Sequence, residues 1–130
     1  MLKKLQIIFK VFIVLLFSVS TTKAELLKPN SDIKPSKVVE IQLSGLQKND
    51  LNYKDSGIEQ TWNFAHPSNK KATGPLNRFK EMIKGNNYQM MIDHLSHTIT
   101  EVGISNKLAQ FEVIIPVSYT HLTLPTTEYV

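Results

Sequence analysis

The sequence of 130 residues contains no cysteine, a single tryptophan, a single arginine and only five glycines. The absence of cysteine excludes a disulfide scaffold, a thiolate zinc site and a cysteine nucleophile. Neither GxGxxG nor GxxxxGK followed by Ser or Thr occurs, so the two common glycine-rich phosphate loops are also excluded. What is present is an apolar fraction of 42%, which excludes a wholly disordered chain, and a length that fits one small domain.

The net charge of +4 is unevenly distributed along the chain. Residues 1–24 carry four lysines and no acidic residue, whereas residues 25–115 carry 11 basic and 10 acidic side chains. A nucleic-acid-binding domain normally presents a strongly basic face. The nearly neutral body of the chain therefore predicts no nucleic-acid partner.

The first 24 residues have the features of a secretory signal peptide. Lysines precede an apolar run at residues 11–19, and Thr22 and Ala24 supply the small residues that signal peptidase prefers before its cleavage site. The run is shorter than the roughly 20 helical residues that span a bilayer. We therefore expect export to the periplasm or outside the cell after cleavage near Ala24, with membrane contact only through this segment. The alternative is an uncleaved N-terminal membrane tether.

The last stretch of the chain resembles translated adapter DNA. Residues 116–126 read PVSYTHLTLPT, which is similar to the translation of a transposase mosaic-end sequencing adapter and its primer extension. The fixed bases after the barcode of that adapter encode valine and a stop codon, and the chain ends in Val130. We expect residues 116–130 to be read-through and the native protein to be truncated near Ile115, so that Tyr119 and His121 belong to no site. The alternative is a strand followed by a polar tail.

Between these ends, residues 25–35 carry two prolines and no periodic pattern, which is typical of a flexible linker. A helix is predicted from Ser36, because Val39, Leu43 and Leu46 recur at i, i+4 and i+7. The polar residues that follow Leu46 end it.

A second helix is predicted from Ser56, which forms a capping-box pattern with Glu59. It ends before Pro67, because the residue that precedes a proline is displaced from helical geometry. A third helix is predicted after Pro75, with Phe79 on its buried face, and Gly85 is a natural residue to follow its end. One more short helical turn is predicted after Asn87.

The periodicity then changes from helical to alternating. Residues 109–115 alternate between apolar and polar side chains, which predicts a half-buried strand. Residues 98–104 predict a less regular strand in which Gly103 marks a bulge, and residues 105–107 predict the turn between the two strands. Helices followed by antiparallel strands give a single α+β domain over residues 36–115.

A family resemblance is carried by three segments of this domain. They are VVxxQLxxLxxND at residues 38–50, GIExTWxFAxPxN at residues 57–69 and TGPLxRFxxMI at residues 73–83, followed by His94. The region of about 35–115 resembles the family known as domain of unknown function 4864, small proteins of bacteria and plants. The resemblance implies the nuclear transport factor 2-like cone, in which helices pack on a curved antiparallel sheet. Since such a cone needs further strands, it also implies a domain truncated after its second strand, and it implies no function.

Acidic and imidazole side chains cluster only at residues 93–97. His94 and His97 three residues apart on a helix could bind a metal, or Asp93 could orient His94 as a general base. However, the segment lies where a helix gives way to a strand, and residues three apart on a strand face opposite sides. A third metal ligand is also missing. We therefore expect no metal and no cofactor, and the alternative role of these histidines is structural.

An anion site is the other candidate. Residues 66–75 predict a polar loop that leads into a helix N-terminus, where free backbone N–H groups bind anions. The candidate residues for phosphate or sulfate are Asn69, Lys70, Lys71, Thr73, Gly74 and Arg78. The alternative is that Asn69 and Thr73 bond local backbone, and that Arg78 pairs with Glu59 or Asp55.

The aromatic residues could line a ligand pocket, but Trp62 and Phe79 are more typical of a hydrophobic core. We expect a non-catalytic exported domain that binds a small ligand or a partner protein. The first alternative is a cone-fold hydrolase or isomerase that uses His94 and Asp93. The second is a non-functional N-terminal fragment of a longer protein, in which the hairpin leaves an open sheet edge.

Overall fold

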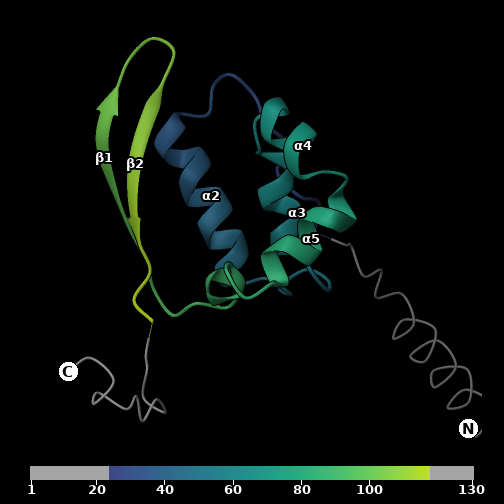
Figure 1. Ribbon diagram of the computed structural model, residues 1–130. Coiled ribbons are helices and arrows are strands. Elements are labelled where there is room, and N and C mark those ends of the chain that lie inside the picture. The colour runs from purple at the N-terminus through teal and green to yellow at the C-terminus, as the bar shows by residue number, and fades with distance from the viewer. Residues whose placement is uncertain (1–23, 118–130) are drawn as a thin grey trace, which may run out of the picture.

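The computed structural model describes residues 24–117, so the predicted signal peptide and nearly all of the predicted adapter segment lie outside the described residues (Figure 1). Four helices and a 3-10 turn precede an antiparallel hairpin, which confirms the predicted α+β class. The elements are α2 (Pro35–Gln47), α3 (Ser56–Asn63), α4 (Pro67–Thr73), α5 (Leu76–Lys84), η1 (Gln89–Met91), β1 (Thr98–Ile104) and β2 (Ala109–Ile114). No helix in residues 24–117 is long and apolar enough to cross a membrane.

α2 and α3 approach each other closely, and two glycines allow it. A Cβ on Gly57 would lie 1.8 Å from the carbonyl oxygen of Gly45, so no other residue fits at position 57 without moving the helices. Leu46 and Ile58, which are almost completely buried, pack beside this contact. Phe79 of α5 extends the core and also contacts Trp62, with ring centroids 5.1 Å apart. The prediction that Trp62 and Phe79 belong to the core is therefore confirmed.

The N-terminus of α3 is capped from outside the helix. Asp55 is the residue before α3, with φ of 65°, and its side chain makes no capping hydrogen bond. Instead, the buried Asn49 accepts the Gly57 N–H with its backbone oxygen at 2.8 Å and the Ile58 N–H with Oδ1 at 3.0 Å. The predicted capping box of Ser56 and Glu59 is wrong, because Ser56 lies inside the helix and its hydroxyl donates to the Asn49 carbonyl oxygen.

A short helix, α4, replaces the polar loop predicted for residues 66–75. Pro67 does follow the end of α3, but it also occupies the first turn of α4, where its missing N–H costs nothing. His66 supports this start by accepting the Ser68 N–H at Nδ1. Gly74 ends the helix against Trp62, since a Cβ there would lie 2.7 Å from that ring.

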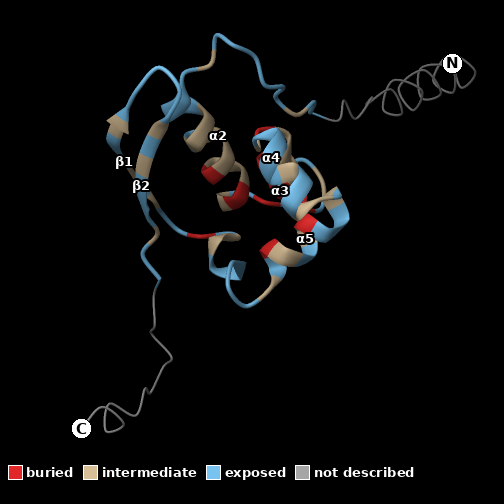
Figure 2. Ribbon diagram, turned by 45° about the horizontal axis from the view of Figure 1, so that its top comes forward, coloured by how far each residue is buried: buried red, intermediate tan, exposed pale blue. Residues whose placement is uncertain are grey.

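The two strands form a hairpin beside α2 (Figure 1). The register runs from Thr98 opposite Ile114 to Ile104 opposite Ala109, with an irregularity between Glu101 and Gly103 where the bulge was predicted. The buried residues lie in the helices and in the segments that join them, and none lies in the hairpin (Figure 2). Large apolar side chains near the tip, at Val102, Ile104 and Leu108, are each at least 60% exposed. The helical half therefore supplies the core of the described residues.

Candidate functional site

The segment that precedes α2 is held against α3 by one side chain. Residues 24–34, which we name the arm, contain no helix or strand. The Gln60 side-chain amide accepts the Leu27 N–H at 2.8 Å and donates to the Leu27 carbonyl oxygen at 2.9 Å. Gln60 is buried, whereas the Leu27 side chain is 56% exposed. The predicted linker is therefore tied down at its third residue, through its main chain rather than through its side chain.

A groove of about 370 Å³ lies between the arm, α2 and α3. Apolar side chains from the arm, α2 and the α2–α3 connection line it together with small, amide and charged residues. The lining residues are Leu26, Leu27, Lys37, Glu40, Ile41, Ser44, Gly45, Lys48, Leu51, Asn52, Ser56, Gly57 and Gln60. The volume is within the range of small-molecule sites, roughly 300–1,000 Å³.

The charged residues at the groove are not equivalent. Lys37 pairs with Glu40 at 3.0 Å across one helical turn, and both side chains are about half exposed. Lys48, at the other end of α2, is exposed and forms no ion pair within residues 24–117. The groove therefore combines an apolar wall with one unpaired positive charge. This arrangement suits a ligand that has an apolar body and an anionic or polar end.

The residues predicted to bind an anion lie on α4, at its C-terminal end and on α5. The Lys70 ammonium donates to the Asn63 carbonyl oxygen at 3.3 Å and lies over the Trp62 ring at 5.7 Å from its centroid. The Thr73 hydroxyl donates to the Asn69 carbonyl oxygen at 2.7 Å, as the local-backbone alternative expects. Lys71 is exposed on α4, and Gly74 packs against Trp62. The structure therefore assigns packing and capping contacts to most of this set.

Arg78 is exposed on α5 and forms no ion pair within the described residues, so the pairing predicted with Glu59 or Asp55 is wrong. Asp55 instead accepts a hydrogen bond from Lys84 at 2.6 Å and another from Asn49 at 3.2 Å. Burial by itself raises the pKa of Asp55, but these two hydrogen bonds and the nearby lysine charges outweigh burial and lower it. Asp55 therefore serves as a buried structural carboxylate.

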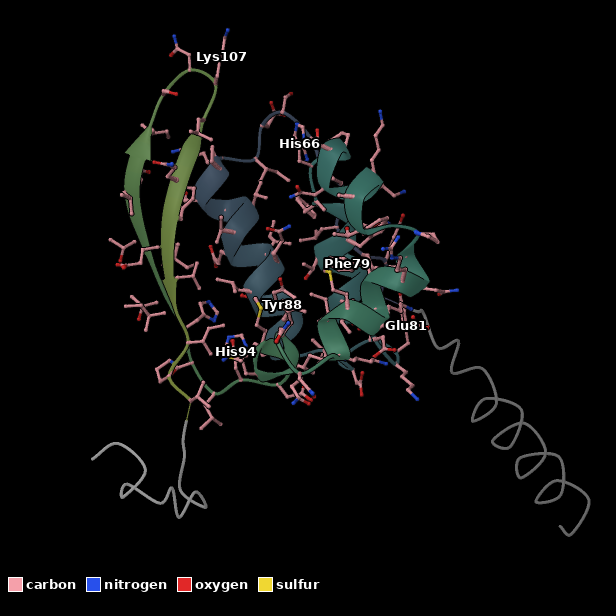
Figure 3. All side chains as sticks on the ribbon, in the orientation of Figure 1. His66, Phe79, Glu81, Tyr88, His94 and Lys107 are labelled. Carbon is pink, nitrogen blue, oxygen red and sulfur yellow. The ribbon has the colours of Figure 1, made fainter. Side chains whose placement is uncertain are left out.

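The two histidines of residues 93–97 do come together. The segment is neither helix nor strand, so the expectation that they face opposite sides does not apply. The Nε2 atom of His94 lies 2.7 Å from the Nδ1 atom of His97, and His94 Nδ1 lies 2.7 Å from the Met91 carbonyl oxygen. Figure 3 shows His94 at the opposite end of the hairpin from Lys107.

The hydrogen bonds of this pair determine its tautomers. The Met91 carbonyl oxygen can only accept, so His94 carries its proton on Nδ1 and, when neutral, accepts at Nε2. A neutral His97 therefore donates from Nδ1 and keeps a lone pair on Nε2. Burial, followed by the neighbouring His94, lowers the pKa of His97, and Glu40 opposes this shift. The half-buried His97, rather than His94, holds the free base nitrogen.

Asp93 does not orient either histidine through a hydrogen bond. Its Oδ1 atom accepts the Asn49 N–H at 3.4 Å, and its own N–H donates to the Leu46 carbonyl oxygen. Its backbone is left-handed, with φ of 54°, which directs the chain away from η1 toward β1. The predicted partnership of Asp93 with His94 is therefore wrong. Within residues 24–117, no three His, Asp or Glu side chains are grouped so that they could hold a metal ion.

Sequence reasoning did not find Gln60 or the groove. A glutamine on a helix is ordinary in a sequence, and its partner Leu27 is 33 residues away. No protein-family model, curated protein or solved structure matches the chain. The resemblance to domain of unknown function 4864 therefore stays a prediction.

Proposed function

We propose that this chain is an exported, non-catalytic binding domain whose ligand site is the groove between the arm, α2 and α3. The observation that carries the proposal is the groove itself, which joins apolar walls to hydrogen-bonding side chains and to the unpaired Lys48. Such a combination is typical of sites that hold an apolar body and orient it through a few polar groups. Export after cleavage near Ala24 would leave the arm as the mature N-terminus.

The experiment uses 8-anilinonaphthalene-1-sulfonate, an apolar anion whose fluorescence rises when it leaves water. Ser44 is half-buried and lines the groove, so Ser44→Leu places a larger side chain inside it. We expect the dye affinity to fall at least fivefold in this variant. Ser68→Leu makes the same substitution on exposed α4 and should leave the affinity unchanged. Equal loss in both variants, or no loss in Ser44→Leu, would contradict the proposal.

The exported state is tested separately. Expression of the full chain in a bacterial host, followed by mass spectrometry of the periplasmic fraction, should give a protein that begins at Glu25. A chain recovered only in the membrane fraction with its first 24 residues intact would support the tether instead.

A hydrolase or isomerase is a second candidate, favoured by the free Nε2 atom of His97. The amide nitrogen of asparagine occupies nearly the place of the imidazole Nδ1, so His97→Asn keeps the donor to His94 and removes the base. If the chain is an enzyme of this kind, the variant should lose activity toward model esters while its melting temperature changes little. Equal activity in the variant and the parent would exclude His97 as the base.

A further inference from the structure

The contact between Gln60 and the arm recognises a main chain. The amide side chain donates to the carbonyl oxygen and accepts from the N–H of the same residue, Leu27. A primary amide offers one donor and one acceptor side by side, which matches the two polar groups of one extended residue. Neither bond depends on the identity of the side chain at position 27. Any residue except proline could be held in the same way.

The arm is attached by little else. Leu26 and Ile33 are half-buried, whereas Leu27 is exposed and the Glu25–Lys28 ion pair is local and mostly exposed. Further along, the Asp32 N–H bonds to Asn30, which is again a contact within the arm. A neutral hydrogen bond contributes only a modest net free energy, and the conformational entropy lost when each residue of the arm becomes ordered opposes that contribution. Outside the two bonds to Gln60, the hydrogen bonds and the ion pair of the arm are therefore made within the arm itself or with the start of α2.

We propose that Gln60 and the α2 and α3 walls of the groove form a recognition site for an extended peptide segment of a partner protein, and that the arm occupies the Gln60 end of this site in the free protein. The inference rests on the proposed binding function and names its ligand class. The peptide would place the backbone of one residue at Gln60 and an adjacent apolar side chain against the α2 and α3 walls, where Leu26 of the arm now lines the groove. Lys48 favours an acidic residue in the same segment, because it is the unpaired charge at the groove.

The test uses the full chain and two variants at one position. Leu27→Pro removes the N–H from which Gln60 accepts a hydrogen bond, and so weakens the attachment of the arm to its own chain. Gln60 and the α2 and α3 walls of the groove keep their residues. Leu27→Ala keeps that N–H and is the matched control, since the Leu27 side chain is mostly exposed. The probe is a fluorescein-labelled peptide with the sequence of residues 25–34, ELLKPNSDIK, followed by fluorescence anisotropy.

We expect Leu27→Pro to bind the peptide at least tenfold more tightly than Leu27→Ala or the parent chain. Adding Gln60→Ala to Leu27→Pro should remove most of this binding. Gln60→Glu keeps the acceptor but loses the donor, so it should also weaken binding if Gln60→Ala proves too unstable to study. Equal affinity of the two Leu27 variants, or binding that survives both Gln60 changes, would overturn the inference.

Two further outcomes separate this inference from the proposal on which it rests. If the dye binds and responds to Ser44→Leu but the peptide does not bind, the groove is a ligand site and main-chain recognition is wrong. If neither binds, both proposals fail. A stable dimer of the parent chain in sedimentation, lost in Leu27→Pro, would show that arms are exchanged between copies and would overturn the partner-peptide assignment.

Discussion

Replacement of Gly57 by alanine should be the most damaging single-methyl change in the helical half. The added Cβ would lie 1.8 Å from the Gly45 carbonyl oxygen and 2.8 Å from the Asn49 Cα atom. α2 and α3 would have to separate by about 1.6 Å for the first contact to reach an ordinary distance. That movement would loosen the core packing of Leu46 and Ile58 and lengthen both hydrogen bonds that Asn49 accepts from the first turn of α3.

The expected loss follows from these two effects. Overpacking of a tight contact costs about 1–3 kcal/mol, and weakening two hydrogen bonds adds about 1 kcal/mol each. The free energy of unfolding should therefore fall by about 3–5 kcal/mol, which corresponds to a melting temperature lower by about 15–30 °C in a domain of this size. The assay is thermal unfolding followed by circular dichroism and by Trp62 fluorescence.

The matched control is Gly85→Ala at the end of α5. There φ is −73°, and the nearest atom to a new Cβ is the Met82 carbonyl oxygen at 3.2 Å. Since alanine adopts this conformation without strain, the change should be within about 1 kcal/mol of zero. A loss below about 1 kcal/mol for Gly57→Ala would refute the argument from the helix contact.

Three other perturbations test the polar interior and the histidine pair. Asn49→Ala removes a buried acceptor of the Ile58 N–H and should cost about 2–4 kcal/mol in urea unfolding, whereas Asn69→Ala on exposed α4 should cost less than about 0.5 kcal/mol. The pKa of Asp55 is lowered in the folded chain, so its contribution to the free energy of unfolding is present above the unfolded pKa of about 3.8. This contribution is lost as pH falls through the folded value. Asp55→Asn should therefore make the free energy of unfolding depend less on pH in strong acid. The pKa of His97 is also lowered in the folded chain, so as pH falls the unfolded chain binds this proton at a higher pH than the folded chain does. The free energy of unfolding should therefore fall as pH drops below about 6.5. His97→Asn should remove part of that fall.

Each of these has a clear contrary result. Equal urea midpoints for Asn49→Ala and Asn69→Ala would show that the cap is not a stabilising contact. An acid profile unchanged by Asp55→Asn would mean that this carboxylate titrates alike in both states. If the free energies of unfolding of His97→Asn and of the parent change in parallel between pH 7 and pH 5, His97 does not contribute to the pH dependence of stability.

The elements with a strong local period were predicted well from the sequence. The helix of residues 35–47, the hairpin strands and the bulge near Gly103 all lie within a residue or two of their expected places. Local periodicity reports which face of an element is buried, and that information is present in consecutive residues. Local periodicity does not predict α4. Pro67 marks the end of α3 in the sequence, but in the structure it also begins α4.

The contacts that define the candidate site could not be predicted in this way. Gln60 and Leu27 are 33 residues apart, and Asn49 caps α3 across a turn that no capping motif describes. Strand geometry predicts that His94 and His97 face opposite sides, yet the loop that contains Asp93 bends so that both rings meet. Each of these depends on tertiary packing, which a single sequence does not display.

The way in which α3 is held has a consequence for how the chain opens. Its first turn depends on Asn49, its middle contacts α2, and Gln60 ties it to the arm. The hairpin, in contrast, lies beside α2 without a buried residue of its own, and the segment at residues 93–97 that leads into it bonds to the end of α2. Amide hydrogen exchange should therefore divide the molecule into two cooperative units, with the slowest amides in α2 and α3. The strands should exchange through a separate, lower-energy opening that leaves the helices intact.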